Sequence, residues 1–407
     1  MNINKIREDF PVLQKKLGGK PIIYFDNACM SLKPRQVVEK IDEYYNEYPA
    51  CAERSHHKLG KRATEEYEQV RGTVKKFLNA KSEHEIIFTR NTTEAINLVA
   101  KSYDFKKDTV IIQTGKEHNS NLIPWQMLIK DKGFNHEIIP AGPDDGFDLK
   151  KFEQILSRVR MQGKNPFVAM VYTSNMDGSS IPVKEIIKLS HDYHAKVLLD
   201  CAQAVAHKKV DVRKLDADFI AFSGHKMLGP TGTGVLYGKE EMISGLKPFL
   251  TGGSTVKDST YETVEFEEAP NMFEAGLQDY AGIIGFGEAI KYLSKYIDDI
   301  GAHEQKLNTK ATNLLNEQIN ILGPQDPKQR SGIVSFNAKN GMDHHEVALL
   351  LDSFANVMVR SGRHCVHSWF NANNIEGSAR ASMYLYNTEE EVQVFADKLK
   401  EILKMKK

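Results

Sequence analysis

Residues 218–234 have the sequence DFIAFSGHKMLGPTGTG, and this stretch decides the fold that we expect. The apolar run before Ser223 predicts a buried strand. The glycine-rich segment after Lys226 predicts a loop in which the backbone turns freely. A lysine at the end of a buried strand can lose water from its amine, which lowers its pKa and makes it a nucleophile toward carbonyl groups. A solvated loop lysine is the alternative for this motif alone, since most lysines are exposed.

A second strand end favours the nucleophilic interpretation of Lys226. Residues 196–200 form a short β-rich run that ends in Asp200, and Gln203 follows after a turn. Ligands of open α/β sheets bind outside the carboxyl ends of the strands, where we expect Asp200 and Lys226 to lie close together. A lysine that forms a Schiff base, next to an aspartate that keeps a pyridine nitrogen protonated, is typical of pyridoxal 5'-phosphate (PLP) sites. Gln203 is well placed to bind the ring hydroxyl.

A third strand end supplies an expected phosphate site. Residues 85–90 predict a strand, and Asn91 is placed to cap the next helix, with Glu94 as its capping-box partner. Free N–H groups and the positive end of the helix dipole attract anions at such a position. An ordinary capped helix without a ligand is the alternative for this motif alone. The side chains that we expect to add donors to a phosphate are Thr92, Thr93, Ser223 and His225.

Several motifs, taken in order, resemble the fold-type I PLP enzymes of the class V aminotransferase superfamily. Within it the chain resembles the SUF-type (group II) cysteine desulfurases, the branch that includes selenocysteine lyases. The resemblance runs from about Tyr24 to Thr388, which is nearly the whole chain. The motifs that carry it are Asn91–Glu94, Glu117–His118, Ser174–Asn175, Asp200–Gln203, Ser223–Lys226 and Arg360–Cys365.

The resemblance implies a role for each matching residue. The catalytic residues would be Lys226, which binds PLP covalently and removes the α-proton, Cys365, which accepts the sulfur, and His118, which stacks on the ring. The cofactor-binding residues would be Thr92, Thr93, His118, Asp200, Gln203, Ser223, His225 and Lys226. Asn175 and Arg380 would bind the substrate carboxylate, Arg380 through a planar two-pronged contact.

The resemblance and the sequence pattern predict an α/β fold, that of the fold-type I PLP-dependent transferases. Strand-like runs alternate with helical ones, which is typical of a large, mostly parallel sheet with helices on both faces. After residue 287 the pattern changes to a smaller α+β domain. The expected strands are 85–90, 110–113, 168–172, 197–199, 332–337 and 357–360, and the expected helices include 65–78, 183–193 and a closing helix from 388.

Three segments follow from this pattern. Residues 1–20 are expected to pack on the small domain. Residues 21–286 are expected to form the PLP-binding domain. Residues 287–407 are expected to form the small domain, which carries Cys365 and Arg380 to a cleft facing the cofactor.

Cys365 differs from the other cysteines in its neighbours. Arg363 and His364 precede it and His367 follows, and cationic groups stabilise a neighbouring thiolate, the nucleophilic form. A buried core cysteine is the alternative. The remaining cysteines, none of them in a C-x-x-C pair, predict no disulfide framework; they are Cys29, Cys51 and Cys201. We expect no metal site, because structural zinc needs a closed set of four ligands.

The chain departs from the family pattern in three places. Arg363 stands where the family has a histidine, and residues 366–369 replace a short turn containing Ala and Pro. Leu277 stands where the family has a threonine that reaches the phosphate of the neighbouring subunit, and Leu277 has no hydroxyl for that contact across a homodimer. These departures bear on substrate and activation more than on the cofactor.

Composition narrows the class of protein. Lysine plus arginine (54) equals aspartate plus glutamate (54) and the pI is about 7.2, so we expect no binding to nucleic acid or membrane surfaces. No apolar run is long enough to span a bilayer and nothing resembles a signal peptide, which predicts a cytoplasmic enzyme.

The expected reaction converts L-cysteine to L-alanine with a persulfide on Cys365, in a homodimer that passes sulfur to an acceptor or to an Fe–S scaffold protein. The alternatives are a selenocysteine lyase, another class V enzyme (an aminotransferase, a kynureninase-like hydrolase or an epimerase), and a non-catalytic sulfur carrier or scaffold.

Overall fold

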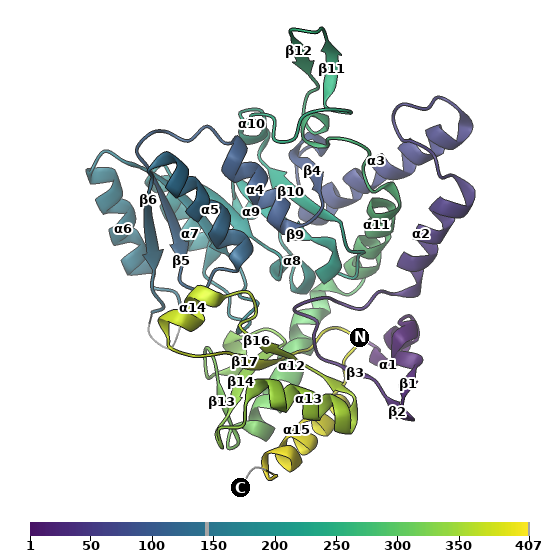
Figure 1. Ribbon diagram of the computed structural model, residues 1–407, viewed down its shortest axis with the longest axis vertical. Helices are drawn as coiled ribbons and strands as arrows, with labels where there is room; N and C mark the ends of the chain where they lie inside the picture. Colours follow the sequence, from purple (N-terminus) through teal and green to yellow (C-terminus); the bar gives the residue numbers. More distant parts are fainter. Residues whose placement is uncertain (143–145, 406–407) are drawn as a thin grey trace.

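The computed structural model of the protein describes residues 1–142 and 146–405. One large sheet lies at the centre of the larger part of the molecule (Figure 1). All its neighbouring strands are parallel except β10, residues 234–238, which is antiparallel to both of its neighbours. Across the sheet the strands are β4 (Ile86–Thr89), β10 (Gly234–Gly238), β9 (Phe219–Ser223), β8 (Lys196–Asp200), β7 (Asn165–Val171), β5 (Thr109–Thr114) and β6 (Asn135–Ile139).

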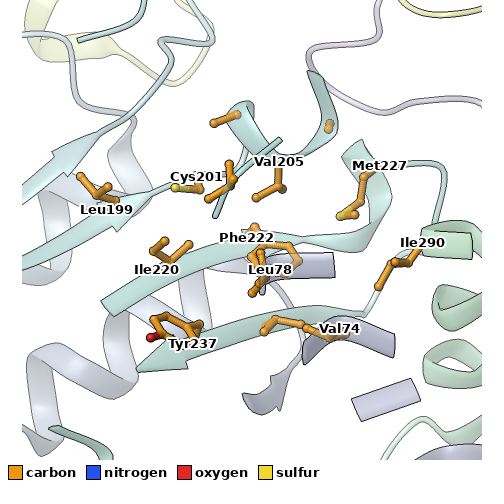
Figure 2. Packing of buried hydrophobic residues seen from close by; sticks show 14 of the residues in the cluster. Val74, Leu78, Leu199, Cys201, Val205, Ile220, Phe222, Met227, Tyr237 and Ile290 are labelled. Atoms are coloured by element: carbon orange, nitrogen blue, oxygen red, sulfur yellow. The ribbon is translucent and has the colours of Figure 1, made fainter. Parts of the chain in front are cut away.

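Both faces of this sheet are buried, which explains why its strands are almost continuously apolar. Ile220 and Phe222 of β9 pack into the core on one face, whereas Phe219 and Ala221 pack into the core on the other. Figure 2 shows Ile220 and Phe222 beside the strand that carries Leu199. The α/β fold predicted from the sequence is therefore confirmed.

Helices cover the two faces of the large sheet. One face packs against α4 (Thr92–Ser102) and α5 (Asn119–Lys132). The helices on the other face are α3 (Lys58–Leu78), α6 (Leu149–Met161), α7 (Val183–Asp192) and α11 (Tyr280–Ser294). The helices expected at 65–78 and 183–193 correspond to α3 and α7. The carboxyl ends of β7, β8 and β9 point toward the smaller part of the molecule (Figure 1).

The smaller part has its own antiparallel sheet and its own core. Its strands, in order, are β13 (Ile319–Ile321), β14 (Ile333–Ala338), β17 (Ser378–Ser382) and β16 (Arg360–Gly362). The helices that pack with it are α12 (Ile297–Leu315), α13 (His344–Ala355) and α15 (Glu389–Leu403).

The strand predicted over residues 357–360 is wrong in detail. The chain forms two strands there, β15 (Val357–Met358) and β16, and they belong to different sheets. β15 pairs in parallel with β3 (Ile23–Tyr24), so the chain must leave one sheet before it joins the other. A continuous apolar pattern cannot reveal such a change of partner.

The proposed domain boundary at residues 286 and 287 falls inside α11. Residues on both sides of it, such as Ile283 and Ile290, pack in the core of the large sheet. Near the N-terminus, the ring of Phe10 contacts Tyr292 of that helix edge-on and Tyr386 at a tilt, so it contacts both parts of the chain. The three-segment division remains a prediction.

Among the described residues, no helix is both long and apolar enough to cross a membrane. The hairpin of β11 (Val256–Ser259) and β12 (Val264–Phe266) projects away from the large sheet (Figure 1).

Candidate active site

A cavity of about 260 Å³ lies at the carboxyl ends of β7, β8 and β9. The large sheet supplies one part of its wall, and β16, β17 and the loop between them supply another. All the site residues predicted from the sequence line this cavity: Thr92, Thr93, His118, Asn175, Asp200, Gln203, Ser223, His225, Lys226, Cys365 and Arg380.

Lys226 lies in one turn of 3-10 helix, η4 (Gly224–Lys226), directly after β9. Only glycine fits at position 224, because a Cβ atom there would collide with Thr233 Oγ1 and the ring of Phe286. Lys226 follows this closely packed turn and lines the cavity. Burial lowers the pKa of the Lys226 amine, and the charge of Asp200 opposes that shift. The amine is thereby favoured in its neutral, nucleophilic form.

Asp200 and Gln203 offer groups that match a PLP ring. Asp200 is buried, and its Oδ1 accepts a hydrogen bond from Ala202 N–H at 2.9 Å. Burial raises the pKa of the Asp200 carboxyl, and the charge of Lys226 opposes that shift. Gln203 donates its Nε2 hydrogen to Ala28 O at 2.7 Å, which leaves Oε1 buried without a partner. A buried acceptor of this kind needs a donor, and the hydroxyl of a PLP ring is one.

The expected phosphate site is formed at the start of α4. Asn91 Oδ1 accepts from Glu94 N–H at 3.0 Å, as predicted for the helix cap. The predicted capping box is wrong, because the Glu94 carboxylate accepts from Arg90 N–H and not from Asn91 N–H. The hydroxyls of Thr92 and Ser223 lie 2.6 Å apart, and Thr92 N–H donates to Ser223 Oγ.

Two further donors complete this cluster. Thr93 Oγ1 lies 2.7 Å from Ser120 Oγ, and Thr93 is exposed whereas Thr92 is buried. Burial, together with the charge of Lys226, lowers the pKa of His225 to about 4, so His225 is neutral near pH 7 and can donate one hydrogen. Hydroxyls, a helix N-terminus and a ring N–H form a donor set that fits a phosphate.

His118 caps the N-terminus of α5 through its ring. Its Nδ1 accepts a hydrogen bond from Ser120 N–H at 3.0 Å, so the proton of the neutral imidazole belongs on Nε2. Burial lowers the pKa of His118 to about 3, and the charge of Lys226 adds to the effect. A neutral, desolvated imidazole suits stacking on an aromatic ring.

The loop that carries Cys365 has an unusual backbone. His364 (φ 49°) and Cys365 (φ 61°) are consecutive residues in the left-handed region, which costs free energy for residues other than glycine. Two hydrogen bonds hold the loop against the start of α5 and the loop after β7. Asn119 N–H donates to Cys365 O, and Asn175 Nδ2 donates to His364 O, each at 2.7 Å. These bonds fix the thiol at the cavity.

Arg380 is buried in β17 and offers a free donor. Its Nη1 donates to Asn175 O at 2.8 Å and its Nη2 to Asp26 Oδ1 at 3.3 Å, whereas its Nε has no partner. A buried guanidinium with an open donor fits a carboxylate ligand. Asn175 donates one Nδ2 hydrogen to His364 O, and its acceptor Oδ1 is buried without a partner. The Asn175 amide has a second N–H, which can donate to a substrate carboxylate while the bond to His364 O is kept.

Sequence reasoning missed Cys29 and Arg360, which also line the cavity. It expected His364, another lining residue, to be a cation beside Cys365, but burial lowers the pKa of His364 to about 2 and the ring is neutral. Arg360 lies inside the motif Arg360–Cys365, and Cys29 directly follows the residues where the resemblance begins. Their positions in those motifs were the available signal. Within the described parts of the chain, no three His, Cys, Asp or Glu side chains are grouped as metal ligands.

Known proteins resemble this chain over nearly its whole length. The chain is 40% identical over 402 residues to a probable cysteine desulfurase of Synechocystis, covering 97% of this chain and 94% of the relative. It is 41% identical over 404 residues to a probable cysteine desulfurase of Pyrococcus abyssi, covering 98% and 97%. The structure of a cysteine desulfurase from Thermococcus onnurineus has a TM-score of 0.92 and 38% identity, covering 99% of this chain and 98% of that one. Residues 23–395 match the aminotransferase class-V family, and the chain belongs to this family.

Proposed function

We propose that the protein is a PLP-dependent cysteine desulfurase, which converts L-cysteine to L-alanine and collects the sulfur as a persulfide on Cys365. The observation that carries the proposal is the meeting of a desolvated lysine, a buried aspartate and a thiol at one cavity. The names of the relatives support the same activity.

The lining residues fit PLP at complementary points. Thr92, Ser223 and His225 would hold the phosphate, and Thr93 would add a hydroxyl at its edge. Asp200 would keep the pyridine nitrogen protonated. Gln203 Oε1 would accept from the ring hydroxyl, and His118 would stack on the ring. When bound, PLP supplies an electron sink for the charge that develops at the substrate α-carbon.

Lys226 would move the α-proton of the substrate. Its amine must be neutral to accept this proton, and the lowered pKa of Lys226 favours that form. Arg380 would orient the substrate through its carboxylate, using the free Nε donor.

Cys365 would then attack the substrate sulfur as a thiolate. A bond forms between Cys365 Sγ and that sulfur, and the bond between the sulfur and the substrate β-carbon breaks. The electron pair of the broken bond stays with the carbon skeleton. The skeleton then takes up one proton at the β-carbon and one at the α-carbon, in place of the proton that Lys226 removed, and leaves as alanine. The hydrogen bonds from Asn119 and Asn175 would keep the thiol at the reacting position.

The oligomeric state and the partners are part of the same proposal. We propose a homodimer, as in the family that the sequence resembles, with Leu277 at the face that a second subunit would cover. Leu277 is 70% exposed and lies on a second cavity together with Thr89 and Arg90, beside the phosphate site. Cys365 would pass its sulfur to an acceptor protein, such as a scaffold for Fe–S cluster assembly. All four cysteines are free thiols, and chemistry that depends on them suits the reducing cytoplasm.

The test uses the purified protein loaded with PLP and the variant Cys365→Ser. Wild type should form alanine from L-cysteine, and alkylation followed by peptide mass mapping should find added sulfur on the Cys365 peptide. Cys365→Ser should keep the visible absorbance of bound PLP and should form neither alanine nor the persulfide. Alanine formation at the wild-type rate by the variant would refute the proposal.

A further inference from the structure

A second thiol lies in the active-site cavity. Cys29 is half-buried and lines the same cavity as Cys365. Its backbone is held firmly, because Cys29 N–H donates to Asp26 O at 3.1 Å and the adjacent Ala28 N–H donates to Ser382 Oγ at 2.9 Å. Gln203 also binds Ala28 O. The sulfur is therefore presented from a rigid segment next to the residue proposed to bind the cofactor ring.

A guanidinium group contacts the sulfur of Cys29. Arg360 Nη1 donates to Cys29 Sγ at 2.7 Å, and the Arg360 side chain is 37% exposed, so it reaches the open part of the cavity. An adjacent guanidinium stabilises the negative charge that a sulfur atom carries as a nucleophile.

The two other cysteines lack this combination of cavity access and a cationic partner. Cys201 is fully buried, and burial raises the pKa of its thiol, which disfavours the reactive form. Cys51 does not line the cavity, and its sulfur contacts Ala52 O and the hydroxyl of Tyr280.

Both cavity thiols lie within electrostatic reach of one amine. The charges of Cys29 and of Cys365 each raise the pKa of Lys226 and partly offset the effect of burial. The same cavity holds the unpartnered Nε of Arg380 and the unpartnered Oδ1 of Asn175, both on side chains that are more than nine-tenths buried. The two sulfurs thus line a cavity whose unpartnered donor and acceptor can bind a small polar ligand.

We propose that Cys29 is a second sulfur-accepting residue, which takes the terminal sulfur from the persulfide on Cys365. This inference rests on the proposed function, which supplies that persulfide. The Cys29 thiolate attacks the outer sulfur, a new S–S bond forms on Cys29, and the bond between Cys365 Sγ and the outer sulfur breaks. Cys365 leaves as a thiolate, so the exchange needs no oxidant and no reductant. The transfer frees Cys365 for another substrate while Arg360 stabilises the sulfur held on Cys29.

The experiment counts the alanine released in a rapid burst, with PLP-loaded protein, excess L-cysteine and no other thiol or acceptor, before L-cysteine itself removes sulfur from the persulfides. Wild type should release about twice as much alanine per site as Cys29→Ser, because only wild type has two places to store sulfur. Cys51→Ser is the matched control, since this half-buried thiol lies outside the cavity, and its burst should equal that of wild type.

Alkylation at successive times then locates the sulfur by peptide mass mapping. In wild type the added sulfur should be found first on Cys365 and later on Cys29. In Cys365→Ser, Cys29 should stay unmodified. The inference is overturned if Cys29 gains no sulfur while wild type forms alanine, if Cys29→Ser keeps the full burst, or if Cys29 gains sulfur in Cys365→Ser. A wild-type protein that makes no alanine would instead refute the proposed function.

Discussion

The two walls of the active-site cavity are built in different ways. On the wall formed by the large sheet, Lys226 and Asp200 follow buried strands, and Thr92 begins a capped helix. None of the proposed cofactor-binding residues has a left-handed backbone. On the opposite wall, His364 and Cys365 are both left-handed, and they accept hydrogen bonds from Asn119 at the start of α5 and from Asn175 in the loop after β7.

The position of a side chain on the first wall is determined by the packed core, whereas the position of Cys365 is determined by a few hydrogen bonds. A side chain at the end of a buried strand is placed by the whole sheet, so single contacts matter little to its position. A left-handed residue other than glycine costs on the order of 1–3 kcal/mol, and it persists only where its surroundings hold it. We call the wall formed by the large sheet the cofactor wall and the wall that carries His364 and Cys365 the thiol wall. We expect substitutions in the cofactor wall to remove a reacting group without moving its neighbours. We expect substitutions in the thiol wall to displace Cys365.

The largest effect is expected at the centre of the cofactor wall. Lys226→Ala removes the proposed base for the α-proton and should lower alanine formation about 10²–10⁴-fold. Borohydride reduction followed by peptide mapping should place a pyridoxyl group on Lys226 in wild type and nowhere in the variant. A label on another lysine would contradict the assignment of the base.

A smaller loss is expected when the charge of Asp200 is removed. Asp200→Asn keeps the shape of the side chain but loses the carboxylate that would stabilise a ring proton, an interaction of about one to three pKa units. Exchange of the substrate α-proton in D₂O should slow by roughly 10–10³-fold. Bound PLP should largely remain, because Thr92 and Ser223 still hold the phosphate. Full exchange activity would show that Asp200 does not act on the ring.

The cofactor wall is also the part that the sequence predicted best. The pattern of residues 218–234 predicted the buried strand, the turn after it and the position of Lys226, because all three depend on residues that are neighbours in the sequence. The same holds for Asp200 and for the cap of α4 by Asn91.

The thiol wall could not be predicted in the same way. The left-handed backbone at Cys365, its bond from Asn119 and the thiol of Cys29 in the same cavity depend on contacts between residues far apart in the chain. The split of residues 357–360 between two sheets has the same cause, because strand partners are chosen by tertiary packing. Motif order identified Cys365, but only the folded chain shows what holds it.

Asn175 offers a direct test of the thiol wall. Asn175→Ala removes the hydrogen bond to His364 O, and leaving that carbonyl unpaired costs about 1–3 kcal/mol. Persulfide formation on Cys365 should slow about tenfold, while α-proton exchange by Lys226 should change much less. Asn119→Ala is the matched control, because it keeps the backbone N–H that binds Cys365 O and loses only the contact with His367. Equal losses in both reactions would assign Asn175 to substrate binding instead.

The smallest effect expected is on stability, and it involves both walls. Burial is the main cause that lowers the pKa of His118 to about 3, of His225 to about 4 and of His364 to about 2. An unfolded histidine has a pKa of about 6.5, so between pH 6.5 and those values the unfolded chain binds more protons than the folded chain. Stability is therefore full above pH 6.5 and falls as the pH is lowered, by about 1.4 kcal/mol per histidine at pH 5.5.

Urea denaturation of the PLP-loaded protein at pH 7.5 and pH 5.5 measures this loss. His118→Gln and His364→Gln should each lose less stability between the two pH values than wild type does, by about 1 kcal/mol, because each variant lacks one buried group that must be kept neutral. His56→Gln is the control, since His56 is exposed, and its pH dependence should match that of wild type. If only His118→Gln reduces the pH dependence, His364 is protonated in the folded protein at pH 5.5. The loop around Cys365 would then open to water without global unfolding, which contradicts a loop held firmly by its two hydrogen bonds.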